Sequence, residues 1–166
     1  IPPAVYLAKA NTPGNAHSDQ YRGDNKLMVD DITEAKDLAD VVIVDMQWGE
    51  EYRHSQNVYQ ECDGRAAVSA GADIINGAHS HVVQGIEYYQ DGVIFYGLGN
   101  TLFDQSQGDH VREGTMVKHM IYDGEYIGYE HIVTYIPPDI QTEFASAERR
   151  DKVLNTIYNN SLINTE

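Results

Sequence analysis

Two short apolar runs separated by a helical stretch constrain the fold of this chain more than any other feature. Val41-Val42-Ile43-Val44 is a continuous β-branched run, typical of a strand covered on both faces, and residues 73–76 form a second run. Residues 56–70 have a helical apolar pattern, made by Val58, Cys62, Ala66 and Ala70. Strands joined by a helix lie parallel in one sheet, so the sequence predicts a mixed α/β domain whose sheet starts parallel.

The flanking segments complete this order of elements. Before the first run we expect a strand over Val5–Ala10, a loop over residues 11–28, and a short helix from Asp30 or Asp31 to Leu38. After the second run, turn residues between alternating segments predict two antiparallel hairpins, over residues 86–96 and 116–135. Residues 145–160 are expected to form a terminal helix.

A two-histidine loop follows the second apolar run, in the sequence Gly77-Ala78-His79-Ser80-His81. If this segment is extended, residues two apart point to the same side, so both imidazoles can converge on one centre. The carboxyl ends of strands in open α/β sheets are where ligands bind. The pattern therefore predicts a metal or phosphoester site at this loop.

Three loops come together if strands over residues 41–45, 73–76 and 93–97 lie side by side. They are residues 47–51, 77–81 and 97–104. His79 and His81 are then candidate ligands, and the acidic residues are candidate ligands or proton carriers: Glu50, Glu51 and Asp104. Asn100 is a candidate catalytic residue, although asparagine in such a loop more commonly bonds the loop backbone. We expect Trp48 to pack under its loop.

Four ordered motifs within about residues 31–135 resemble the CapA-type capsule or poly-γ-glutamate synthesis proteins. They lie in residues 40–52, 70–73, 77–87 and 95–104. The resemblance implies a calcineurin-like metallophosphatase fold, in which two packed sheets form a β-sandwich flanked by helices, with a dinuclear metal site at the strand ends. It also implies an extracytoplasmic role in making, moving or anchoring an anionic surface polymer.

This sequence departs from the family pattern at the site itself. Gln47 stands where the family carries a histidine, and Ala78 replaces another. The family's early Gly-Asp motif and its Asn-Glu motif are not found in these 166 residues. We therefore expect the carboxyl-terminal portion of such a domain over residues 1–144, with residues 145–166 as a terminal helix packed on it.

Two functions remain open at this stage. In the first, His79, His81 and Gln47 hold a divalent metal ion such as zinc, manganese or iron, and Glu50 and Asn100 assist hydrolysis of a phosphoester or an anionic polymer. In the second, the module has lost its metal and serves in assembly, because an incomplete sheet exposes an edge that pairs readily. We then expect self-association or pairing with a complementary amino-terminal segment.

Composition limits the partners and the location. A net charge of −15 offers no basic patch for phosphates, so nucleic acid is not expected as a partner. No apolar run approaches the ~18 residues of a membrane span. The single cysteine, Cys62, excludes an internal disulfide framework and is expected to be buried. Together with the resemblance, this favours an extracellular or cell-surface protein.

Overall fold

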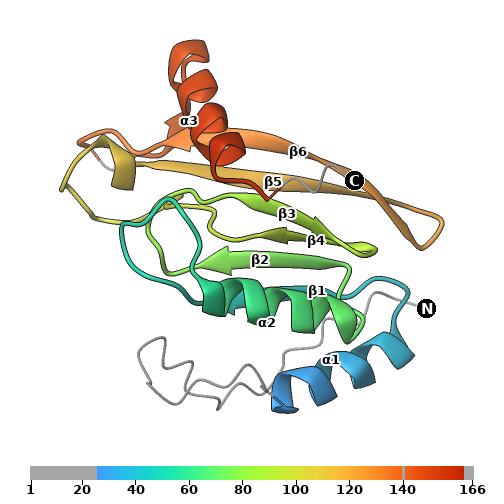
Figure 1. Ribbon diagram of the computed structural model, residues 1–166. Coiled ribbons are helices and arrows are strands. Elements are labelled where there is room, and N and C mark those ends of the chain that lie inside the picture. The colour runs from blue at the N-terminus through green and yellow to red at the C-terminus, as the bar shows by residue number, and fades with distance from the viewer. Residues whose placement is uncertain (1–25, 140, 163–166) are drawn as a thin grey trace.

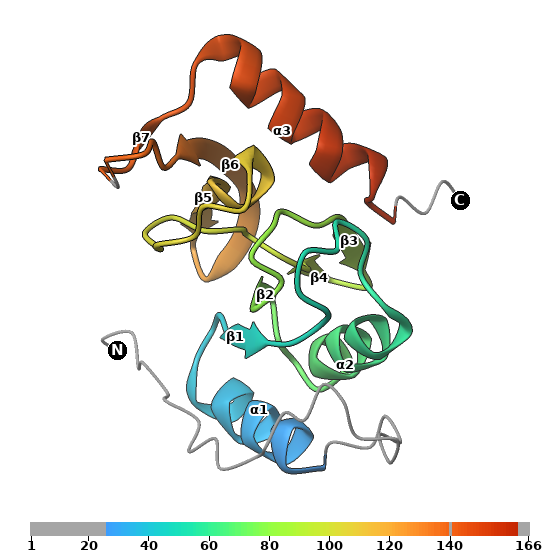
Figure 2. The same cartoon turned by 90° about the vertical axis from the view of Figure 1, so that its left-hand side faces the viewer.

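A computed structural model describes residues 26–139 and 141–162 of the chain. Within them, two β-sheets pack face to face, two helices cover the outer face of the first sheet, and the last helix packs against the core that the two sheets share (Figures 1 and 2). The predicted mixed α/β sandwich flanked by helices is confirmed.

The first sheet has the strand order β1-β2-β4-β3. Its strands are β1 (Ile43–Gln47), β2 (Ile74–Ala78), β3 (Ile86–Tyr89) and β4 (Gly92–Phe95). β1, β2 and β4 are parallel, and β3 returns antiparallel to β4. The side-by-side placement on which the clustering of the three loops depends is therefore confirmed.

The second sheet is antiparallel, with the strand order β5-β6-β7. It consists of β5 (Glu113–Tyr122), β6 (Glu125–Tyr135) and the two-residue β7 (Glu143–Phe144), and a short 3₁₀ helix, η1 (Asp109–Val111), precedes β5. β5 and β6 form a long hairpin around Asp123 and Gly124, both at positive φ. Both hairpins predicted from turn residues are therefore present.

Three α-helices complete the described part of the chain: α1 (Lys26–Leu38), α2 (Val58–Ser69) and α3 (Ala147–Asn159). α2 begins with a capping box, in which the Asn57 side chain accepts from backbone N–H groups and the Gln60 side chain accepts from the Asn57 backbone. α1 includes Lys26 and so extends further toward the amino terminus than the predicted start at Asp30 or Asp31. None of the helices in these residues is long and apolar enough to cross a membrane.

Successive residues of the central strands belong to two different cores. Ile75 and Ile94 pack with α1 and α2, whereas Ile74, Val93 and Phe95 pack with the second sheet and α3. Because side chains of a strand alternate between faces, a strand covered on both sides needs a continuous apolar run. β2 and β4 each contain such an apolar run and are covered on both faces.

Three details of the sequence prediction are wrong. β1 is an edge strand among the described strands, and its Ile43 is 47% exposed, so the run beginning at Val41 is not covered on both faces. The apolar face expected for α2 is the wrong face, because Val58 is exposed and the helix buries Gln60, Asp63, Gly64, Ala67 and Val68 instead. Cys62 is exposed rather than buried for the same reason.

Two other expectations cannot be compared with the structure. The strand over Val5–Ala10 and most of the following loop lie outside the described residues. The predicted extents of the two parts, residues 1–144 and 145–166, also stay a prediction. α3 does pack on the domain, since Val153 and Ile157 are each 1% exposed and belong to the core between the sheets.

The buried face of α2 includes a carboxyl group whose charge opposes folding. Asp63 is 9% exposed, its Oδ1 has no hydrogen-bond partner among the described residues, and burial raises its pKa to about 6. The folded state therefore binds more protons than the unfolded state between pH ~4 and ~6, and stability falls as the pH rises through that interval.

We expect Asp63→Asn to stabilise the protein at pH 7.5 by about 1–2 kcal/mol, because the buried charge is removed at constant shape. The gain should disappear below pH ~4, where the wild-type carboxyl is protonated in both states. Urea denaturation at several pH values measures it. Asp91→Asn, at an exposed turn, is the control and should change little. A gain that does not depend on pH contradicts this account.

Candidate functional site

The site lies where three parallel strands end. Gln47 is the last residue of β1 and is paired in register with Ala78, the last residue of β2. The backbone N–H of Trp48 donates to Ala78 O (3.2 Å), and Leu98 N–H donates to Gly77 O (3.1 Å), so the three loops leave the sheet side by side. Trp48 is buried, stacks on Tyr96 and donates from Nε1 to its carbonyl, which confirms its packing role.

The two-histidine loop is not extended. His79 and His81 have φ values of +89° and +58°, in the region that residues other than glycine rarely adopt. Ser80 holds this conformation, because its carbonyl accepts from Tyr52 N–H (2.8 Å) and its hydroxyl donates to Val82 O (2.7 Å). The expectation that an extended segment aligns the imidazoles is wrong, yet the rings still lie close, with centroids 6.2 Å apart.

A cavity of about 210 Å³ brings most of the predicted residues together. Its lining includes Gln47, His79, His81 and Asn100, from all three loops. Strand adjacency is the reason, because the carboxyl ends of neighbouring parallel strands meet at one edge of a sheet.

Asn100 determines the tautomer of His81. The Asn100 side-chain Nδ2 donates to Val111 O (2.8 Å) and to Gln105 Oε1 (3.0 Å), so its Oδ1 is the atom that faces His81 Nδ1, at 3.0 Å. Since Oδ1 can only accept, Nδ1 of His81 carries the proton and Nε2 of the neutral ring keeps its lone pair. Metal-binding histidines are commonly oriented in this way through the nitrogen that does not bind the ion.

Aromatic and amide side chains that the sequence did not single out shape the surroundings of His81. The Phe103 ring lies 4.9 Å and the Tyr52 ring 6.0 Å from the His81 ring, centroid to centroid. Gln84 is buried and donates to Arg53 O (2.9 Å) and Ser55 O (3.3 Å), which ties the 49–56 loop to the site. Tyr52, Phe103 and Gln84 all lie within the quoted motifs, but only their contacts reveal these roles.

The candidate acids lie around the cavity rather than in it. Glu51 Oε1 is 4.0 Å from His81 Nε2 and remains half exposed. Glu50 is exposed and its nearest charged partner is Arg53, at 3.7 Å. Asp104 is exposed as well, and neither Glu50 nor Asp104 is among the cavity-lining residues. The arrangement therefore brings His79, His81, Gln47 and Asn100 together, with Glu51 at the rim.

The donor set limits the kind of metal ion that could bind. No group of three or more His, Cys, Asp or Glu side chains within the described residues could hold a metal ion. Two imidazoles and the Gln47 amide suit one weakly held cation such as zinc, since an amide oxygen is a poorer ligand than imidazole for such ions. A dinuclear centre does not fit, because the described cavity lining has no carboxylate to bridge two ions.

Comparison with known proteins gives consistent matches to one group. The family described as "Bacterial capsule synthesis protein PGA_cap" matches residues 3–105. The PGA biosynthesis protein CapA of Bacillus subtilis (strain 168) is 42% identical over 114 residues, which cover 69% of this chain and 28% of that protein. The capsule biosynthesis protein CapA of Bacillus anthracis is 41% identical over 101 residues, which cover 58% of this chain and 24% of that protein.

The family match includes the part of the chain that forms the two-histidine cavity. The family match contains all eight residues that line the cavity and ends before β5, whereas the motif resemblance extended to about residue 135. The chain spans about a quarter of the length of the two relatives.

Proposed function

Because this chain belongs to the PGA_cap family of bacterial capsule synthesis proteins, we propose that it acts at the cell surface in making or anchoring an anionic capsular polymer of the poly-γ-glutamate type. Its two relatives are named for PGA and capsule biosynthesis, which supports this polymer class. In this proposal the two-histidine cavity binds one divalent cation and, through it, an anionic group of the polymer or of a phosphoester.

The observation that carries the proposal is the pairing of His81 with Asn100. In the neutral imidazole it leaves the lone pair of His81 on Nε2, beside His79 and Gln47, in a cavity at the strand ends. When bound, a divalent cation supplies Lewis-acid polarisation of a phosphoryl or acyl oxygen. The chain's own residues position it: Asn100 holds the imidazole, and Ser80 holds the loop at its strained φ values.

Cation retention tests this assignment. The purified chain is dialysed against Zn²⁺ or Mn²⁺, freed of excess ion, and analysed by mass spectrometry for metal and by calorimetry for affinity. We expect about one equivalent per chain, because the cavity offers one set of two imidazoles. The double variant His79→Ala/His81→Ala should lose at least ~10-fold in affinity.

His110→Ala is the matched control, because His110 lies outside the cavity lining and its loss should leave retention unchanged. Lack of retention by the wild-type chain, or equal retention by the double variant, contradicts the proposal. Turnover of phosphodiester and γ-glutamyl substrates, measured with and without the cation, then separates a hydrolase from a binding module.

A non-catalytic assembly role is the second candidate, and one observation favours it. β1 is an edge strand among the described strands, and its Ile43 is half exposed. Such an edge presents unpaired N–H and C=O groups to another chain or segment. Lack of cation retention together with a mass larger than one chain in light scattering supports this role, whereas a monomer without bound cation counts against both.

A further inference from the structure

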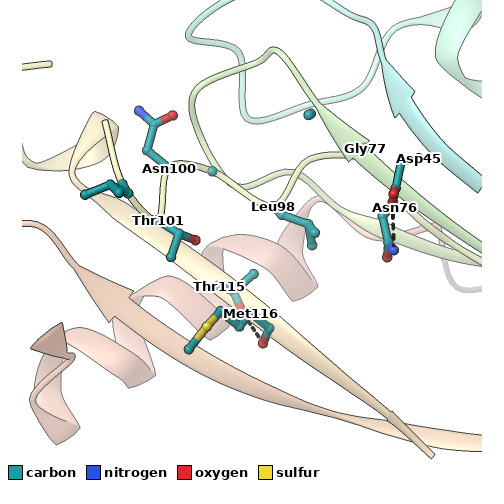
Figure 3. Close-up of a pocket in the computed structure, with 11 residues that line it drawn as sticks. Asp45, Asn76, Gly77, Leu98, Asn100, Thr101, Thr115 and Met116 are labelled. Atoms are coloured by element: carbon teal, nitrogen blue, oxygen red, sulfur yellow. Dashed lines mark hydrogen bonds between the residues drawn. The ribbon is translucent and has the colours of Figure 1, made fainter. Parts of the chain in front are cut away.

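A second, larger cleft adjoins the two-histidine cavity and has no role in the proposed function. Its volume is about 460 Å³, and it lies between the ends of β1 and β2, the loop after β4, and the start of β5 (Figure 3). It shares Ala78, Gly99 and Asn100 with the smaller cavity, so a thin wall of common residues separates the two.

Two acceptor groups lie at one end of this cleft. Asn76 on β2 donates from Nδ2 to Oδ1 of Asp45 on β1 at 3.1 Å, as the dashed line in Figure 3 shows. This bond sets the direction of the Asn76 amide, and its Oδ1 is then buried without a hydrogen-bond partner among the described residues. An unsatisfied buried acceptor costs about 1–3 kcal/mol, so it is a position where a donor from a ligand is favoured.

The rest of the lining determines the charge of that ligand. Among the described residues, no Lys, Arg or His side chain lines the cleft, so none of them places a cation there beside the Asp45 carboxylate. Leu98 and Met116 provide an apolar wall facing the same space (Figure 3). The Asp45 carboxylate repels a carboxylate or phosphate, whereas an ammonium group can donate to both acceptors while its alkyl chain contacts the apolar wall.

We propose that this cleft is a binding subsite for a primary ammonium group on an alkyl chain, held by the Asp45 carboxylate and Asn76 Oδ1. The subsite lies beside the two-histidine cavity, so a molecule that carries both an amine and an anionic group would be placed with its amine here. Asp45 and Asn76 are not among the residues proposed to bind the divalent cation, so the two proposals can be tested separately.

An NMR titration tests the subsite directly. ¹H–¹⁵N spectra of the 166-residue chain are recorded with increasing 1,5-diaminopentane at constant ionic strength, and in parallel with 1,5-pentanediol, its uncharged counterpart. We expect saturable shifts for the amides of Asn76, Leu98 and Thr115 with the diamine only. Asp45→Asn keeps an acceptor for Asn76 Nδ2 but removes the charge, and should weaken diamine binding at least about fivefold.

Matched variants separate this result from general charge effects. Asp91→Asn removes one charge at the turn between β3 and β4 and should bind the diamine as the wild type does. The variant His79→Ala/His81→Ala should also retain diamine binding, whatever its cation affinity. Equal binding of the diol, the absence of saturable shifts in the wild type, or undiminished binding by a folded Asp45→Asn variant overturns the proposal.

Discussion

Gly77→Ala is expected to destabilise the protein by about 3 kcal/mol or more, the loss typical of severe overpacking, and to leave little native protein. A Cβ at this position would lie 2.0 Å from the Tyr96 carbonyl oxygen and 2.5 Å from Trp48 Nε1. Both obstacles belong to the contact between β2 and the loop after β4, where Trp48 Nε1 donates to that same carbonyl at 2.8 Å. Backbone cannot shift there without separating the strands that support the two-histidine loop.

Urea denaturation followed by fluorescence measures this loss, since Trp48 is the single tryptophan and its ring is buried against Tyr96. Gly64→Ala is the control. There a Cβ would lie 3.1 Å from the nearest atom, the flexible end of the Ile94 side chain, and alanine favours the helix by about 1 kcal/mol. We expect Gly64→Ala to change stability by less than ~1 kcal/mol. If the two variants lose equal stability, the close approach at Gly77 is not the cause.

Glu87→Ala is expected to cost about 1–3 kcal/mol, because it leaves the buried Tyr96 hydroxyl without its hydrogen-bond partner. Glu87 is 1% exposed, and Arg65 donates to it from Nε (2.9 Å) and contacts it through Nη2 (2.8 Å). The Tyr96 hydroxyl donates to its other oxygen. Burial, together with this bond to Glu87, raises the pKa of Tyr96, so its hydroxyl stays a donor at all accessible pH values.

Glu61→Ala is the matched control, because Glu61 pairs with the same Arg65 at 3.5 Å on the surface of α2. A helical ion pair at the surface contributes about 0.3–0.5 kcal/mol, so Glu61→Ala should change the free energy of unfolding very little. Thermal and urea denaturation of both variants measure the difference. Similar losses for Glu61→Ala and Glu87→Ala would show that burial does not determine the strength of this network.

Much of the fold was predictable because its signals are local. The apolar runs before Gln47 and Gly77 predict the parallel strands, and the turns at Gln90 and Asp123 predict the hairpins. Each of these signals lies within a few residues of sequence. Once the strands were placed side by side, the clustering of His79, His81 and Asn100 followed, because parallel strands end at one edge.

The sequence prediction was wrong about which face of α2 is buried, because contacts with residues far away in the chain determine that face. α2 buries Gln60 and Asp63 rather than Val58, because Gln60 donates from Nε2 to Gln84 Oε1 at 2.8 Å and to the Tyr96 carbonyl. A periodicity of apolar residues cannot anticipate such a polar network, since its partners lie 24 and 36 residues away. The exposure of Cys62 follows from the same rotation of the helix.

The sequence by itself determined the order of the elements, the parallel start of the first sheet and the family, because these depend on local pattern and motif spacing. Only the tertiary structure decided the left-handed backbone of His79 and His81, the tautomer of His81 and the position of the acceptors at Asp45 and Asn76. Each of these depends on a hydrogen bond or close packing between segments far apart in the chain, and such contacts exist only after the strands have come together.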